Sequence, residues 1–343
     1  MAHPALAVGT SVVESVLRLP APAQNAPPYC PLCFHVAFAK ILETFHAYTL
    51  HECAGCGLQF WDPRKMPDAR WYSAMYGERN ERLLPLEPGH CFFLADQLAP
   101  RCGRLLDVGC GTGNFLLAAN LAGYAVSGIE LDTAAARLAS YYCPRARVFP
   151  LPLESFRAHY PNQVFDVVSF FEVLEHQADP AAFLAEARAC LRPRGFIALS
   201  VPNRNRWQTG LDALDYPPNH FLRWSPDSLV AVLKAQGFSI MSLQQEKVSL
   251  HYAAQQINSK LRLGVARSLA PEMPGWFRDE IQQDPEEKEQ RNRAGLSLRT
   301  RAVQRLGRWK YAACFPLAAA ALPFVRYQGQ VGPYLYCLAR KLD

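Results

Sequence analysis

The sequence has no long uninterrupted apolar run and no block of like charge. The apolar stretch Ala312–Val325 is too short and too interrupted by proline to span a membrane. The net charge of +6 is spread along the chain, so charge alone does not indicate nucleic-acid binding. Residues 1–28 are rich in Ala and Pro but lack a basic start followed by an apolar core, so no export signal is expected.

Cysteine is not scarce, but its spacing does not favour disulfides. Of the 11 cysteines, four form two pairs, and the others are scattered in apolar contexts, which is typical of a reducing cytoplasm. The pairs Cys30/Cys33 and Cys53/Cys56 are separated by 19 residues, a spacing that presents four thiolates to one metal ion. Because all four positions would be protein ligands, we expect a structural zinc; the alternative is four unrelated cysteines.

Composition and hydrophobic patterning divide the chain into six segments. They are a flexible leader 1–28, a zinc ribbon 29–60, a helical bridge 61–100, a core 101–249, a helical insertion 250–332 and a last strand 333–343. In the bridge, Tyr72 and Tyr76 share a helix face. The insertion is expected to form a cap or lid over the core.

The core alternates strands with helices, which predicts an α/β fold with a doubly wound, mainly parallel sheet of seven strands. Helices are expected up to Gly123, Tyr142 and Arg192, and from Pro226 to Gln236. The predicted strands are Leu105–Val108, Ala125–Glu130, Arg147–Phe149, Phe165–Phe170, Phe196–Val201, one from Phe238, and Tyr334–Ala339.

A glycine-rich turn follows the first of these strands. Gly109, Gly111 and Gly113 form GxGxG, whereas a dinucleotide-binding turn needs GxGxxG and would have glycine in place of Asn114. Glu130 closes the next strand, where an acid can bind both hydroxyls of a ribose. With Asp107 also present, the turn is suited to a cationic cofactor that carries a ribose but no phosphate.

From Arg104 to Phe238 this order of motifs resembles the class I S-adenosylmethionine-dependent methyltransferases. The resemblance implies that the chain binds S-adenosylmethionine and that a tyrosine-rich segment such as Tyr72–Tyr76 covers it; core packing is the alternative. The cofactor contacts that it implies are Asp107, Gly109, Cys110, Gly111, Gly113, Glu130, Leu131, Glu154 and Phe171.

The segment Phe170–His176 is similar to ubiquinone-type O-methyltransferases. In that family a Glu-His pair lies near the reaction site, which corresponds to Glu175 and His176. A histidine beside a carboxylate can remove a hydroxyl proton. His220, in the loop after the fifth core strand, is a second candidate base. The alternatives are that His176 caps a strand-to-helix junction and that His220 braces its loop.

These observations predict O-methylation of a small-molecule or glycan hydroxyl. The resemblance to ribbon-bearing sugar methyltransferases favours a carbohydrate, although the large C-terminal domain of sugar C-methyltransferases is missing. Ribosomal-RNA methylation is a second hypothesis, weakened because the segment lacks the Asn/Asp-Pro-Pro-aromatic clamp of amino-group methyltransferases. A third is a non-catalytic scaffold that senses the cofactor and binds a partner through its ribbon.

Residues 299–325 combine basic and apolar side chains, which suits an anionic membrane surface as well as packing on the core. The sequence does not determine the oligomeric state.

Overall fold

The predicted strands of the core pair into one sheet of seven strands, in the order β10-β11-β8-β7-β4-β5-β6. The computed structural model describes residues 29–35, 38–65, 83–207, 210–267 and 298–343. In this sheet β11 runs antiparallel to both neighbours, and β4, β5, β6, β7 and β8 are parallel. The doubly wound fold is therefore confirmed. The strands are β4 (Gly103–Val108), β5 (Tyr124–Ile129), β6 (Arg147–Phe149), β7 (Phe165–Phe171), β8 (Leu191–Pro202), β10 (Phe238–Lys247) and β11 (Val331–Lys341).

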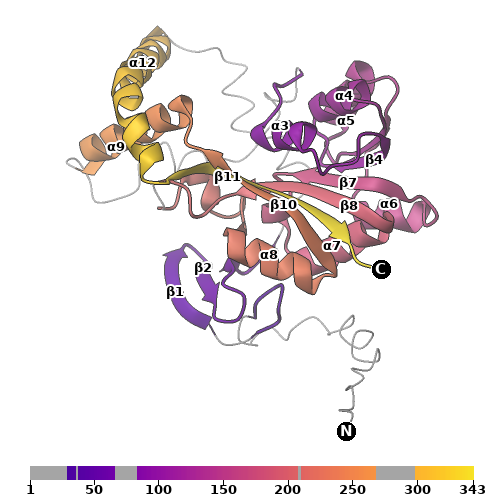
Figure 1. Cartoon of the computed structure of the whole chain (residues 1–343). Helices are drawn as coiled ribbons and strands as arrows, with labels where there is room; N and C mark the ends of the chain where they lie inside the picture. The colour runs from indigo at the N-terminus through magenta and orange to yellow at the C-terminus, as the bar shows by residue number, and fades with distance from the viewer. Residues whose placement is uncertain (1–28, 36–37, 66–82, 208–209, 268–297) are drawn as a thin grey trace.

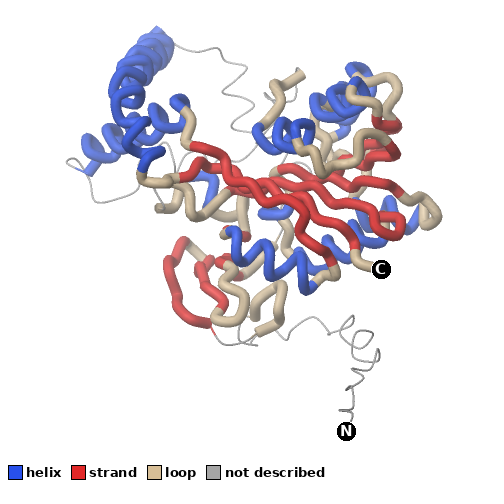
Figure 2. The backbone as a smooth tube through the Cα atoms, viewed as in Figure 1, coloured by secondary structure: helices blue, strands red, loops and turns tan. Residues whose placement is uncertain are grey.

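Helices cover both faces of this sheet, as parallel strands require (Figures 1 and 2). One face packs against α3 (Pro88–Ala95), α4 (Asn114–Leu121) and α5 (Thr133–Tyr142) through a buried cluster that includes Phe115. The other packs against α6 (Leu153–His159), α7 (Pro180–Ala189) and α8 (Pro226–Ala235) through a cluster that includes Phe156. The apolar strands are thus buried on both sides.

One helix end differs from the expectation. The helix predicted to reach Arg192 ends at Ala189, and β8 already begins at Leu191. The register of β7 against β8 shifts between Phe165 and Val167, and Arg194 has a positive φ of 60°. The irregular pairing at the start of β8 extends this strand toward its N-terminus, beyond the part that hydrophobic alternation predicts.

The cysteine-rich segment forms a second sheet of four strands, β1-β2-β3-β9. Its first three strands are β1 (Phe38–Phe45), β2 (Tyr48–Cys53) and β3 (Gln59–Asp62). The fourth, β9 (Leu222–Arg223), belongs to the loop between β8 and α8 of the core. The ribbon is therefore joined to the core by main-chain pairing, and buried Trp61 and Trp224 belong to the same apolar cluster.

Between β10 and β11, the described residues form two helices at one end of the molecule (Figure 1). They are α9 (Leu250–Arg267) and α12 (Leu298–Tyr327), and they pack on each other around Cys314 and Ala318. Among the described residues, no helix is both long enough and apolar enough to cross a bilayer. The predicted leader 1–28 and Tyr72 and Tyr76 of the bridge lie outside the described residues. The division into six segments stays a prediction.

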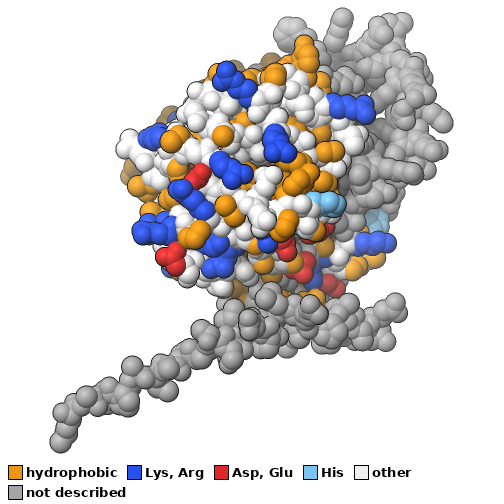
Figure 3. All heavy atoms as spheres, turned by 90° about the vertical axis from the view of Figure 1, so that its right-hand side faces the viewer, with side chains coloured by type: hydrophobic (Ala, Val, Ile, Leu, Met, Phe, Trp, Pro, Cys, Tyr) orange, Lys and Arg blue, Asp and Glu red, His pale blue; other side chains and the backbone are white. Residues whose placement is uncertain are grey.

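The surface face in Figure 3 carries Lys and Arg side chains that are scattered among apolar and neutral ones. On this face they do not merge into one basic patch. That distribution agrees with the spread of charge along the sequence.

Candidate active site

A cavity of about 780 Å³ lies at the carboxyl ends of the parallel strands. It is lined by the glycine-rich turn after β4, the end of β5, the turn after β7, the loop 203–225 and α9. Its volume lies within the range of about 300–1,000 Å³ that is typical of small-molecule sites. Residues predicted from separate parts of the sequence therefore line one space.

The glycine-rich turn is held in a left-handed conformation. A Cβ at Gly113, where φ is +86°, would lie 2.7 Å from the Cα of Ala139 in α5, so glycine permits α4 and α5 to pack closely. At Gly111, where φ is +53°, a Cβ would meet nothing within 4 Å. Gly111 therefore leaves bare main chain open toward the cavity, as a closely bound ligand requires.

Glu130 is tied to this turn. Its Oε2 accepts a hydrogen bond from the Gly111 N–H at 2.8 Å, and its Oε1 accepts one from the Asp132 N–H at 2.9 Å. A carboxylate oxygen can accept more than one hydrogen bond, which suits the two hydroxyls of a ribose. Burial raises the pKa of Glu130.

Asp107 lies at the end of β4 and is 3% exposed. Its Oδ1 accepts a hydrogen bond from Ser169 Oγ at 2.7 Å, and burial raises the pKa of Asp107 to about 8. A cationic ligand would favour the charged form of this acid. The sequence analysis did not single out Ser169, which is a buried position of β7.

The predicted cofactor contacts Cys110, Leu131, Glu154 and Phe171 line the cavity, whereas Gly113 does not. The Cys110 thiol lies close to Gly128, where an added Cβ would approach its Sγ to 2.7 Å. The thiol therefore packs against β5.

His90 of α3, which was not among the predicted site residues, also lines the cavity. Its ring stacks on Phe115 with 5.0 Å between centroids, and Phe171 meets it edge-on at 4.8 Å. Its Nδ1 accepts a hydrogen bond from the Glu87 N–H, and burial lowers the pKa of His90 to about 4. No local motif marks this residue, because only the packing of α3 on the sheet brings it to the site.

The predicted catalytic residues meet at the other half of the cavity. Glu175 and His176 lie in the short 3₁₀ helix η3 (Leu174–His176), and His220 comes from the loop before β9. His176 Nε2 and His220 Nε2 each lie 3.9 Å from Glu175 Oε1, and the two imidazole rings are 4.8 Å apart. His176 Nδ1 donates to the Asn219 carbonyl at 2.6 Å, and the ring also contacts the backbone of Glu172.

Burial determines the charge state of this group. It lowers the pKa of His176 to about 4 and that of His220 well below its usual value. Burial also raises the pKa of Glu175 and, with the Glu87 charge, brings that of Glu172 to about 8. Neutral imidazoles can accept protons. The donor atoms of Glu175, His176 and His220 also lie within 4.8 Å of one another, which is close enough to share a divalent cation.

The four cysteines of the ribbon also converge. Their sulfur atoms lie within 4.8 Å of one another, with 3.6 Å between Cys30 and Cys56 and 3.4 Å between Cys33 and Cys53. Four thiolates at about 2.3 Å from a tetrahedral zinc ion are about 3.8 Å apart. The Gly55 N–H donates to Cys53 Sγ at 3.3 Å, as in a thiolate knuckle.

Comparison with known proteins identifies the family of the chain. Residues 66–243, just over half of the chain, match a family described as a methyltransferase domain. A ubiquinone biosynthesis O-methyltransferase of Thiobacillus denitrificans is 39% identical over 32% of this chain and 49% of its own length. A probable S-adenosylmethionine-dependent methyltransferase of Mycobacterium tuberculosis is 34% identical over 41% of this chain and 52% of its own length.

The similarity to these curated relatives spans about half of their length. Among solved structures, that of the [4+2]-cyclase SpnF covers 81% of this chain with a TM-score of 0.50 and 16% identity, which shows a shared fold. The family match, the fold and the geometry of the glycine-rich turn agree. The chain belongs to the methyltransferase domain family, as a class I member that depends on S-adenosylmethionine.

Proposed function

We propose that the protein methylates a hydroxyl of a small molecule or glycan and that a histidine removes the hydroxyl proton. The observation that carries this proposal is the pair of neutral imidazoles, His176 and His220, beside buried Glu175 in the same cavity as the Gly111–Glu130 cradle. The relative named for ubiquinone O-methylation supports an oxygen atom of a small molecule as the acceptor.

The cofactor residues fit an adenosyl group. When bound, S-adenosylmethionine supplies a methyl group that is already activated by its sulfonium. Glu130 would hold the ribose hydroxyls, and bare main chain at Gly111 permits close approach. Asp107 would offset the positive charge of the ligand.

The histidines would manage the proton. The acceptor hydroxyl would give its proton to a ring nitrogen of His176 or His220, and the resulting imidazolium would in turn favour the ionised form of Glu175, which lies 3.9 Å from both rings. The Nδ1–H bond from His176 to the Asn219 carbonyl orients its ring.

The acceptor end of the cavity favours a polar substrate. Hydrogen-bonding side chains from the loop and from α9 line it, namely Arg206, Asp212, Asn219, Tyr252, Gln255 and Gln256. Such a lining suits an acceptor with several hydroxyl groups, which supports a sugar. It suits a polyprenyl tail less well, because an apolar chain would remove water from these polar groups without offering them hydrogen bonds of its own.

We also propose a structural zinc ion at Cys30, Cys33, Cys53 and Cys56. The tetrahedral spacing of their sulfur atoms supports it. A cytoplasmic location and membrane-surface contact through residues 299–325 stay predictions. In α12, Leu317 and Phe324 are 58% and 62% exposed, which leaves an apolar face available for such contact.

The decisive experiment incubates the purified protein with methyl-labelled S-adenosylmethionine and separate sugar nucleotides, lipid-linked sugars, quinone precursors and RNA. We expect label in a hydroxyl-bearing small molecule or glycan. Transfer to RNA alone would contradict the proposal. Binding of S-adenosylhomocysteine without transfer to any acceptor would instead favour the scaffold hypothesis.

A further inference from the structure

The loop that carries His220 is bound to the cysteine ribbon along its main chain. Immediately after His220, β9 pairs with β3, with Gln59 opposite Arg223 and Phe60 opposite Leu222. The Trp61 N–H donates to the Phe221 carbonyl at 2.9 Å. The ribbon sheet thus takes its fourth strand from the active-site loop.

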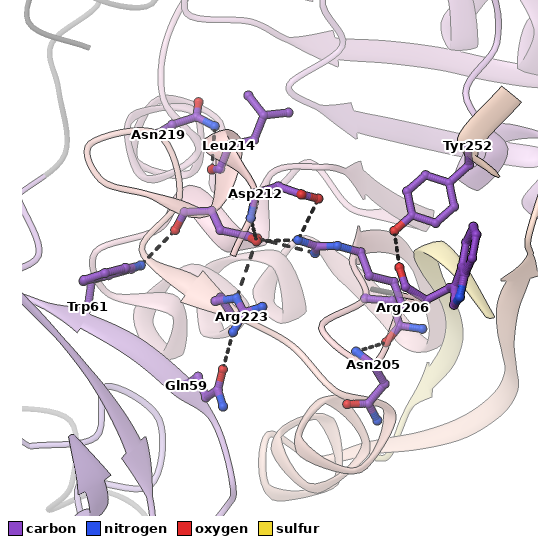
Figure 4. Close-up of polar contacts among 12 residues, drawn as sticks. Gln59, Trp61, Asn205, Arg206, Asp212, Leu214, Asn219, Arg223 and Tyr252 are labelled. Atoms are coloured by element: carbon purple, nitrogen blue, oxygen red, sulfur yellow. Dashed lines mark hydrogen bonds and ion pairs between the residues drawn. The ribbon is translucent and has the colours of Figure 1, made fainter. Parts of the chain in front are cut away.

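Side chains reinforce this connection (Figure 4). The indole Nε1–H of Trp61 donates to the Asp215 carbonyl at 2.8 Å, and Arg223 Nη1 donates to Gln59 Oε1 at 2.6 Å. On the metal side, Arg204 Nη1 donates to the carbonyl of Gly57, which directly follows Cys56, at 2.6 Å. Three polar contacts therefore join the ribbon to different points of one loop.

An ion-pair chain continues from the ribbon to the wall of the cavity. Arg223 Nε lies 3.6 Å from Asp215 Oδ1, Asp215 pairs closely with Arg206, and Arg206 Nη2 lies 3.0 Å from Asp212 Oδ2. Arg206, Asp212 and Asp215 line the cavity, and Arg206 and Asp215 are buried. Loss of one of these residues would leave a buried charge without its counter-charge. The ion pairs therefore hold the wall of the cavity in place only when all of their members are present.

The far side of the same loop contacts the catalytic turn. The Phe221 N–H donates to the Glu175 carbonyl at 2.9 Å, and the Asn219 carbonyl accepts from His176. The residues on either side of His220 are therefore held by main-chain hydrogen bonds, some of which lead to the ribbon and others to η3. By contrast, the carboxylate of Glu130 accepts hydrogen bonds from Gly111 and Asp132, which both belong to the core.

We propose that the ribbon is the positioning element of the acceptor half of the site, and that Arg223 is the residue that transmits its position. The ribbon fixes the described residues 203–207 and 210–225 of the loop, and hence His220 and the polar wall, without acting on the cofactor cradle. The part of this inference that concerns acceptor binding rests on the proposed function.

The test uses the full-length, metal-loaded protein and three variants. Gln59→Ala removes the acceptor for Arg223 Nη1 from a partly exposed strand, and Arg223→Met breaks the ion-pair chain. Arg223→Lys keeps the charge opposite Asp215. Lys40→Gln, on the exposed edge of β1, is the matched control.

We expect Gln59→Ala and Arg223→Met to raise the acceptor KM about tenfold, as the loss of one hydrogen bond to a charged group predicts. The affinity for S-adenosylhomocysteine should stay within about twofold of the parent, and Arg223→Lys should recover part of the KM. Equal losses of acceptor and cofactor binding would overturn the proposal, because they would indicate general unfolding.

Hydrogen exchange gives a readout that needs no acceptor. Backbone amides of residues 211–223 should exchange faster in Gln59→Ala and after metal removal by a chelator, while amides of β4 and β5 keep their protection. Unchanged exchange in 211–223 would overturn the inference. If the parent methylated no acceptor, the proposed function would fail, yet the exchange result would still decide the role of the ribbon.

Discussion

The carboxylate of Glu130 accepts a hydrogen bond from the backbone N–H of Gly111, with 2.8 Å between Oε2 and N. This bond joins the end of β5 to the glycine-rich turn after β4. The hydrogen bond therefore fixes the position of the Glu130 carboxylate relative to the main chain of Gly111 before a ligand binds.

Replacement of Glu130 tests the cofactor cradle. Glu130→Gln should weaken binding of S-adenosylhomocysteine about 100-fold, because hydrogen bonds to a charged group contribute about 1.5–3 kcal/mol each. Calorimetry gives the affinity. Glu186→Gln, on the surface of α7, is the matched control and should bind normally. Normal binding by Glu130→Gln would exclude Glu130 as a ribose ligand.

Replacement of the histidines tests the proton transfer. We expect His220→Gln or His176→Gln to lower kcat by at least about 100-fold, the usual effect of a lost general base. Binding of S-adenosylhomocysteine should be unchanged. Initial rates with and without EDTA complete the test, since activity that survives the chelator assigns these residues to base catalysis. Activity that depends on added Mg²⁺, an ion that the four thiolates of the ribbon do not bind, would assign them to a metal site instead.

The pKa of Asp107 predicts a pH-dependent affinity for the cofactor. Burial raises this pKa from 3.8 to about 8, so ionisation of Asp107 opposes folding as the pH rises through this range. A cationic ligand favours the ionised acid, so affinity for S-adenosylmethionine should increase from pH 6 to 8, by at most about tenfold per unit. Calorimetry at each pH measures it.

Two comparisons separate this effect from general pH sensitivity. S-adenosylhomocysteine lacks the sulfonium charge and should show a smaller dependence on pH. Asp107→Asn should flatten the dependence for S-adenosylmethionine. An unchanged slope in that variant would assign the titration to another group.

The cysteine cluster predicts bound zinc. Purified protein should contain about one zinc ion per chain by elemental analysis, as a four-thiolate site requires. Cys30→Ser should lower this content and the unfolding temperature, because metal binding contributes to folding. Cys102→Ser changes an exposed cysteine outside the cluster and should alter neither. Full zinc content in Cys30→Ser would contradict the site.

The close approach of α4 and α5 at Gly113 predicts a large effect on stability. Gly113→Ala should lower the free energy of unfolding by about 2–4 kcal/mol, through strain at positive φ and overpacking. Gly210→Ala adds a Cβ that meets nothing within 4 Å and should be nearly neutral. Urea denaturation of both variants measures the difference. Equal stabilities would show that α5 moves away at little cost.

The sequence could predict the core sheet because its strands are apolar and its turn chemistry is local. The GxGxG turn and Glu130 lie within one strand-helix-strand unit, so their proximity follows from topology alone. His176 and His220 could be named as candidates, since both follow strands whose carboxyl ends meet at one edge.

Other features depend on packing between distant segments. The two residues of β9 are too few to show alternation, and their partner β3 lies more than 150 positions earlier in the chain. His90 reaches the cavity only because α3 packs on the sheet. The ion pairs of Asp215 join residues that carry no shared motif, so only the structure brings them together.

The position of β11 has a consequence for biosynthesis. This strand lies between β8 and β10, yet it is made after both, and the insertion with α9 and α12 separates it from β10. At about 5–20 residues per second, translation leaves both neighbours without their partner for roughly ten seconds. During this interval the nascent chain exposes two open strand edges, which are templates for aggregation. Chaperone binding to the nascent chain should therefore be greatest just before residue 341 leaves the ribosome.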